Sequence, residues 1–432
     1  MHARLAALAL LATLATATSA RTEEAAATHW PMFGHDAAHR GLSGVVGAQS
    51  PTLNWESATR RFSGNDYQPS LAEFSPVVGA DGAVYFADGE GVVALDADGS
   101  LRWVHPLANA AESVALGPDG AIYAGHGNGL AALNPDGSLR WDFAAGLPLQ
   151  WPIVAPDGRI FASSPAVPKL RGSLGFGVLV AIDPAGRELS RVRVPGGPTA
   201  TPALSADAGV VVPARECTRW HWIDQELTCI QYRALLYAAR PEDPRPHLIF
   251  SAGKGPLGEF ASPSIGRDGS IYVAGNAGHE IALFGLDAKG RARWALPLSC
   301  CGASAPAIGP DGTIYVETLG GGRPLVLHAV TPDGTLRWQA SIRGEFGMER
   351  RPAVGADGLV YGAVLDGTVH AISPDGSIRW TKTLDPDAIF SAPAISSDGS
   401  VILLGSHRRA NRFEYDVTVR AIGPGPAQAG GH

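Results

Sequence analysis

Apolar residues of this chain occur in short alternating runs, and an Asp-Gly pair repeatedly separates one run from the next. The stretch from Phe74 to Trp103 is one complete unit, with Asp81-Gly82 and Asp98-Gly99 between its runs. Short apolar runs bounded by Asp and Gly predict β-strands, and glycine meets the positive φ of the tight turns that join them. We therefore predict four strands in this unit, at 75–79, 83–87, 91–96 and 100–105.

The same unit recurs along almost the whole chain. A period of roughly 38 to 60 residues built from short β patterns is typical of blades or a solenoid. Its last copy lacks an outer strand, whereas an isolated outer-strand sequence, Thr52-Leu-Asn-Trp55, precedes the first copy. A closed ring explains both leftovers, because the N-terminal strand then completes the C-terminal blade. We predict an all-β fold, an eight-bladed β-propeller of four-stranded antiparallel blades closed by that N-terminal outer strand. The first strands are expected to begin at Ser75, Ser113, Trp151, Thr201, Ser262, Ala305, Arg351 and Ala392.

Composition agrees with strands and tight turns, since the 432 residues include 54 Gly and 33 Pro and only 17% are charged. The formal charge is −7 and the basic residues are scattered, which argues against nucleic-acid binding. The Trp of each outer strand is expected to pack between neighbouring blades, with its N–H bonded to a backbone acceptor.

The N-terminus has the pattern of a secretory signal peptide. Arg4 precedes a mostly apolar run at 5–14, and small residues up to Ala20 offer a cleavage site. The run is too short to span a bilayer, although an uncleaved anchor is the alternative. No Cys follows it for lipid attachment, so we expect a periplasmic or secreted monomer with no integral membrane segment after cleavage. The expected divisions are a signal peptide at 1–20, an entry segment at 21–50, the propeller at 51–423 and a disordered tail at 424–432.

The two faces of such a ring should differ. The first and third turns of each blade lie on one face, called here the Asp-Gly face. The second turns and the blade-to-blade connections lie on the other, called the loop-rich face, where insertions occur at 165–177, 215–233 and 407–415. Because irregular loops on a rigid scaffold often carry binding residues, we expect the loop-rich face to be the functional one.

Connections into the inner strands should place polar and aromatic residues around the channel mouth on the loop-rich face. Carboxylates, aromatics and the bidentate fork of Arg could together hold an anionic or planar ligand there. Solvated loop charges that pair weakly are the alternative. The candidate residues are Glu73, Glu112, Trp151, Glu259, Glu349, Arg350 and Arg351, together with Cys300 and Cys301.

Four cysteines in an exported protein suggest two disulfides. Cys217 and Cys229 lie in one insertion, where a bridge would pin the loop. Cys300 and Cys301 are adjacent, and Cα atoms about 3.8 Å apart would strain a bridge between them. Long-range bridges from 217 and 229 to 300 and 301, or a pair of free thiols, are the alternatives.

The repeat Ser-Pro-x-x-Gly-x-Asp-Gly-x-x-Tyr, followed by Ala-Leu-Asp-x-Asp-Gly-x-x-Arg-Trp, resembles the pyrroloquinoline-quinone (PQQ)-like repeat family of β-propellers. The opening Trp30-Pro-Met-Phe-Gly-His-Asp is also similar to the segment that precedes the first blade in those proteins, and the resemblance extends to Ile422. The family includes quinoprotein dehydrogenases and the propeller lipoprotein of the outer-membrane β-barrel assembly machine. The motif is specific for the fold and unspecific for function.

The resemblance gives the cysteine pair a second meaning. Dehydrogenases of this fold carry an adjacent-Cys disulfide against the quinone at the channel mouth, which Cys300 and Cys301 match in position. We recognise no counterpart of their calcium-ligand and catalytic-Asp motifs, and we assign no catalytic residue and no metal site. We therefore expect a binding or scaffolding module, not an enzyme, with a protein, peptide or glycan partner. The alternative is a small quinoprotein oxidoreductase that uses PQQ with a divalent cation such as calcium; a role in outer-membrane protein assembly rests on fold analogy alone.

Overall fold

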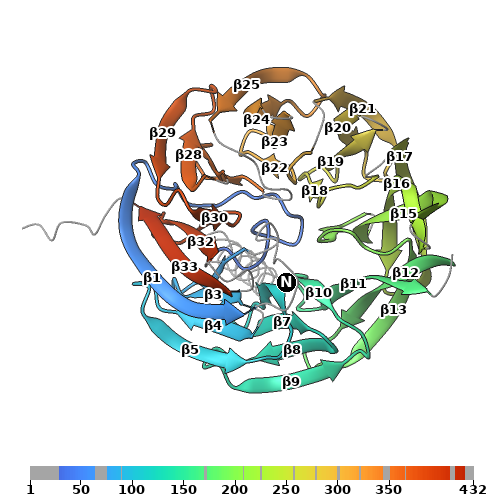
Figure 1. The fold of residues 1–432 in the computed structure, drawn as a ribbon, viewed down its shortest axis with the longest axis horizontal. Coiled ribbons are helices and arrows are strands. Elements are labelled where there is room, and N and C mark those ends of the chain that lie inside the picture. The colour runs from blue at the N-terminus through green and yellow to red at the C-terminus, as the bar shows by residue number, and fades with distance from the viewer. Residues whose placement is uncertain are drawn as a thin grey trace, which may run out of the picture.

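A computed structural model describes residues 29–423 except 64–74, 89, 170–172, 208, 224–225, 256–257, 278–279, 299–301, 321–322, 344–350, 365 and 409–413. The predicted signal peptide and tail lie outside the described residues. Eight antiparallel sheets form a ring of blades around one axis, as Figure 1 shows. In the described part of the chain, no helix is long and apolar enough to cross a membrane.

Each of the first seven blades contains four consecutive strands paired in chain order from the inner to the outer edge. Blade one is β2 (Val77–Val78), β3 (Val84–Ala87), β4 (Gly91–Leu95) and β5 (Leu101–Pro106). Blade two is β6 (Ala110–Leu116), β7 (Ile122–His126), β8 (Gly129–Leu133) and β9 (Leu139–Ala144). Blade three is β10 (Gln150–Val154), β11 (Ile160–Lys169), β12 (Ser173–Ile182) and β13 (Glu188–Pro195). Blade four is β14 (Ala203–Ser205), β15 (Gly209–Ile223), β16 (Glu226–Arg240) and β17 (Asp243–Gly255).

Blades five, six and seven follow the same order, and blade eight differs. Blade five is β18 (Ser264–Ile265), β19 (Ile271–Ala277), β20 (Glu280–Leu286) and β21 (Ala292–Pro297). Blade six is β22 (Ala307–Ile308), β23 (Ile314–Gly320), β24 (Arg323–Val330) and β25 (Leu336–Ile342). Blade seven is β26 (Ala353–Val354), β27 (Val360–Ala363), β28 (Thr368–Ile372) and β29 (Ile378–Thr383). Blade eight contains β30 (Ala388–Phe390), β31 (Ala394–Ile395), β32 (Val401–Arg408), β33 (Glu414–Gly423) and, as its outer strand, β1 (Thr52–Ser63).

The ring closes as predicted. Strand β1 runs antiparallel to β33, with Trp55 opposite Ala421, and the two lie side by side in Figure 1. Arg420 of β33 donates from Nε to Glu56 of β1 at 2.8 Å and from Nη2 to Asp385 at 3.0 Å. Because no turn joins β1 to β33, these polar contacts and the backbone ladder hold the closure together.

The outer-strand tryptophans join neighbouring blades, which confirms the prediction. Trp103 of blade one donates from Nε1 to the carbonyl of Pro135 in the third turn of blade two, at 2.9 Å. Gly137 of that turn has φ 84°, and a Cβ there would lie 2.6 Å from the Trp103 ring. The third-turn glycine is therefore needed twice, once for the turn and once for the neighbouring tryptophan. Equivalent bonds link Trp141 to Pro184, Trp294 to Pro332 and Trp338 to Pro374.

The recurring Asp and Arg of the motif also have a physical role. Arg102, next to Trp103 in the outer strand, donates to Asp81 of the first turn at 2.8 Å. Burial alone would raise the pKa of Asp81, but the bond and charge of Arg102 hold it below its usual value. The same pairing joins Arg140 to Asp119 and Arg337 to Asp311. The acidic first turn is thus balanced by an outer-strand arginine in blades one, two and six.

The entry segment crosses the inside of the ring, where its blue trace is visible in Figure 1. Its backbone bonds to inner strands, with Trp30 paired to Val78 of blade one and Val354 of blade seven donating to Gly41. Further along, the carbonyl of Ala48 accepts a hydrogen bond from Trp380 Nε1 at 3.1 Å. In other blades a third-turn carbonyl is the acceptor for the equivalent tryptophan. Four more carbonyls of the segment accept hydrogen bonds from the backbone N–H groups of inner-strand residues. These bonds run from Leu116 to Pro31, from Leu204 to Ala37, from Ile265 to Ala38 and from Ile308 to Arg40.

Candidate functional site

The structure describes the surroundings of three of the predicted mouth residues, Trp151, Glu259 and Arg351. Glu112 lies in β6, but its side chain is outside the described residues. The other predicted positions fall wholly outside them, namely Glu73, Cys300, Cys301, Glu349 and Arg350.

Arg351 is buried, with 2% of its surface exposed, and does not lie open at the mouth. Its guanidinium donates to the carbonyl of His39 and lies 3.4 Å from that of Ser262 in blade five. It also lies over the Phe33 ring, 5.2 Å from the centroid. Arg351 thus connects blade seven, blade five and the entry segment, which corrects our expectation of an exposed anion fork. Burial lowers its pKa to about 9.

The entry segment beneath Arg351 contains charged groups of its own. His39 is fully buried with φ 56°, and burial together with the Arg351 charge lowers its pKa well below the usual value. Burial alone would raise the pKa of Asp36, yet neighbouring His35 and Arg40 lower it. Arg40 donates from Nε to Asp36 at 2.7 Å. Asp36 and Arg40 therefore stabilise the entry segment itself, and the carbonyl of His39 joins it to Arg351.

Glu259 and Trp151 are likewise engaged by the protein. Arg215 of β15 donates to Glu259, and its guanidinium also lies 4.9 Å from the centroid of the Tyr232 ring. Trp151 is 6% exposed and has φ 54° at an irregularity in the pairing of β10. No group of three metal-ligating His, Cys, Asp or Glu side chains gathers among the described residues.

The insertions of blades three and four continue their strands, where the sequence suggested irregular loops. Strands β15 and β16 have 15 residues each, whereas the equivalent β3 and β4 have 4 and 5. We call residues 215–233 the arm. The predicted Cys217–Cys229 disulfide braces it, which excludes long-range bridges from these two cysteines. The extension arises because backbone pairing between β15 and β16 continues to Ile223 opposite Glu226.

The arm exposes large apolar side chains that the repeat does not explain. Trp220 is 38% exposed and Ile230 is 37% exposed. Most other exposed large apolar residues occupy one repeated position near the start of the outer strands and so belong to the scaffold. These are Leu53, Leu101, Leu139, Leu189, Leu336 and Ile378.

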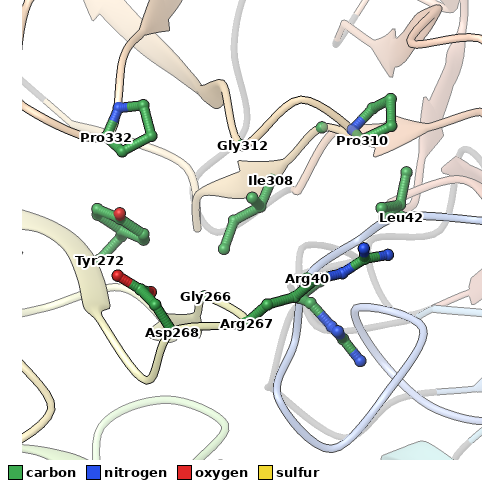
Figure 2. Close-up of a pocket in the computed structure, with 11 residues that line it drawn as sticks. Arg40, Leu42, Gly266, Arg267, Asp268, Tyr272, Ile308, Pro310, Gly312 and Pro332 are labelled. Carbon is green, nitrogen blue, oxygen red and sulfur yellow. The ribbon is translucent and has the colours of Figure 1, made fainter.

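The Asp-Gly face has two hollows beside the entry segment. One, of about 200 Å³, lies between blades five and six, and Figure 2 shows Ile308 directed into it between Tyr272 and Leu42. The other, of about 540 Å³, lies between blades three and four and includes Phe161 and Leu204. Arg40 borders both, but its Nε is already bonded to Asp36. Repeated turns and the entry segment form most of their walls, so these hollows follow largely from the architecture.

Comparison with known proteins agrees with this fold. The family model described as outer membrane protein assembly factor BamB matches residues 322–417. The chain is an eight-bladed β-propeller. Its structure is similar to that of BamB from Moraxella catarrhalis, with a TM-score of 0.52 and 16% identity over 88% of this chain and 100% of that one. It is also similar to the Dos1 propeller, with a TM-score of 0.53 and 11% identity over 85% of this chain and 96% of that one.

A comparison with curated proteins gave no match. At these identities the structural likeness establishes the fold of this chain alone. Its function must be argued from the exposed residues themselves.

Proposed function

We propose that this protein is an exported, non-enzymatic binding or scaffolding module that holds a protein partner on its loop-rich face. The arm is the observation that carries the proposal. It extends from the ring, is braced by Cys217–Cys229, and exposes Trp220 and Ile230 outside the repeat pattern. Exposed aromatic residues are enriched at protein interfaces and often contribute most of the binding energy.

The base of the arm supports the same proposal. Arg215 is held between Glu259 and the Tyr232 ring, so the arm begins from a fixed position on the ring. A surface that is ordered before binding loses less conformational entropy on association. The fold of BamB, an outer membrane protein assembly factor by the family description, is consistent with a scaffolding role. The disulfide is in keeping with export, since disulfides persist in oxidising compartments.

The test is capture of partners from an envelope extract of the source organism, with proteins identified by mass spectrometry and confirmed by reciprocal capture. Trp220→Ser combined with Ile230→Ser should reduce capture by roughly tenfold or more, because hot-spot truncation costs 2 kcal/mol or more. Leu101→Ser combined with Leu139→Ser is the matched control, since it removes similarly exposed apolar groups from scaffold positions. Equal capture by the arm variant, or capture of glycan alone, would overturn the proposal.

The quinoprotein alternative finds no support among the described residues, because Glu259 is paired and Arg351 is buried. Cys300 and Cys301 lie outside them, so the alternative remains a prediction from the resemblance. Its test is the addition of PQQ and calcium to the purified protein. A change in the absorbance spectrum together with a raised melting temperature would favour it.

A further inference from the structure

One edge of the arm has no neighbouring strand among the described residues. Strand β14 pairs with β15 only from Gly209 to Val211, and an isolated bridge from Pro198 reaches Ala214. Beyond Ala214, no strand in the described part of the chain pairs with that edge of β15. On its other edge β15 remains paired to β16 as far as Ile223. Gly196 packs against the carbonyl of Arg215, so the backbone N–H and C=O groups available to an added strand lie beyond Arg215 on this edge.

The arm should keep its shape without a partner. A two-stranded ribbon alone is only marginally stable in water. Here the Cys217–Cys229 bridge links the two strands, and the Thr218 hydroxyl donates to the carbonyl of Gln231 at 3.1 Å. Preformed backbone geometry favours strand addition, because only the partner then loses conformational entropy on binding.

Charge on the arm indicates which kind of strand would fit. Arg215 is balanced by Glu259, and Arg233 lies 3.9 Å from Glu216. Arg219 lies on the exposed surface beside Trp220, and no acidic partner for it occurs among the described residues. Among the described side chains, an incoming strand therefore meets one cation without an acidic partner, next to an apolar ring. Carboxylates alternating with apolar residues are the chemistry that complements both.

Building on the proposed function, we infer that the arm binds its protein partner by β-strand addition along the edge of β15 from Glu216 to Ile223. The added segment is extended and alternates apolar with acidic residues. Backbone hydrogen bonds supply affinity, whereas Arg219 and Trp220 select the side chains.

The direct test uses labelled peptides of about ten residues, the length of a typical strand, with the full oxidised protein. One peptide alternates Val and Glu, the second alternates Val and Lys, and the third replaces every other Val of the first with Pro. By fluorescence anisotropy, the Glu peptide should bind roughly tenfold more tightly than the Lys peptide, because the interaction of the peptide with Arg219 changes from attraction to repulsion. The Pro peptide should not bind, because proline cannot donate to a ladder.

Two variants give the test its specificity. Arg219→Glu should reverse the preference from the Glu peptide to the Lys peptide. Arg343→Glu is the matched control, since Arg343 is exposed just after β25 at the same end of its blade, and it should leave the preference unchanged. Amide exchange should slow along residues 216–223 when the Glu peptide is bound.

Equal binding of the three peptides, or protection confined to other strands, would overturn strand addition. If capture from extract still depends on Trp220 and Ile230 in that case, the proposed function stands and only the mode of binding fails. If neither depends on the arm, both proposals fail.

Discussion

At the scale of single residues, Arg351 is the point at which distant parts of the chain meet. Its guanidinium reaches the backbone of His39 in the entry segment and of Ser262 in blade five, and it packs on Phe33. A buried charge is tolerated only when hydrogen bonds replace its lost hydration. These carbonyls provide that replacement, so removal of the side chain should cost stability on both sides of the contact.

We predict that Arg351→Met lowers the free energy of unfolding by about 3 kcal/mol, because buried carbonyls lose their donors. Arg351→Lys should also destabilise, since an ammonium cannot reproduce the planar fork. Urea unfolding measures both, and amide exchange at 36–41 should accelerate in each variant. The control is Arg343→Met at an exposed position, which should change stability by less than about 0.5 kcal/mol. Unchanged unfolding in Arg351→Met would contradict the anchoring role.

The sequence placed Arg351 correctly at the start of an inner strand and misjudged its exposure. The position follows from the repeat, which is local and periodic. The burial depends on Phe33 and His39, which lie more than three hundred residues earlier and follow no repeat. Contacts of this kind have no signature in a single sequence, so the burial of Arg351 could not be predicted from it.

At the scale of elements, the contact between a third-turn glycine and the tryptophan of the preceding blade sets the blade spacing. Gly137 faces Trp103, Gly186 faces Trp141 and Gly376 faces Trp338, each with a positive φ. The recurring Arg-Trp pair predicted that the tryptophan packs between blades, but not that the third-turn glycine of the next blade would face its ring. The sequence did not predict that the insertions would continue as paired strands, since β15 and β16 beyond Ala214 have no repeat partner with which to compare.

Gly137→Ala and Gly146→Ala separate the two demands on such a glycine. Both residues have positive φ, 84° and 75°, but a Cβ at 146 meets nothing within 4 Å whereas one at 137 lies 2.6 Å from Trp103. Gly146→Ala should cost about 1 kcal/mol for the left-handed backbone alone. Gly137→Ala should cost a further 1–3 kcal/mol, roughly, for crowding in a packed core.

Trp103→Leu tests the source of that extra cost. In its background the penalty of Gly137→Ala should fall towards that of Gly146→Ala, because the leucine leaves room for the added methyl group. Chemical unfolding of the single and double variants gives the coupling energy directly. Additive costs would show that the tryptophan ring is not what excludes a side chain at 137.

At the scale of the whole molecule, the N-terminal residues complete the ring in two ways. The entry segment bonds to inner strands around the axis, and β1 supplies the outer strand of blade eight. The second connection joins the start of the chain to β33, the last strand made, so the ring can close only when synthesis of the last blade is complete. Such long-range pairing is slow to form and leaves the edge of β33 exposed until it does.

The closure should therefore be the weakest junction of the ring. In blades one to seven a turn ties the outer strand to the third strand, whereas β1 is held by its ladder, by Glu56 and by Trp55 packed against Gly99. Trp55→Ala should free β1 and open tryptic sites at Arg60 and Arg61, while Trp103→Ala leaves β5 tethered. A loss of about 2 kcal/mol in pairing would raise the open population, and with it the cleavage rate, roughly thirtyfold. Equal cleavage in the two variants would mean that the ladder alone secures the ring, and that the tryptophan serves blade spacing at this junction as it does elsewhere.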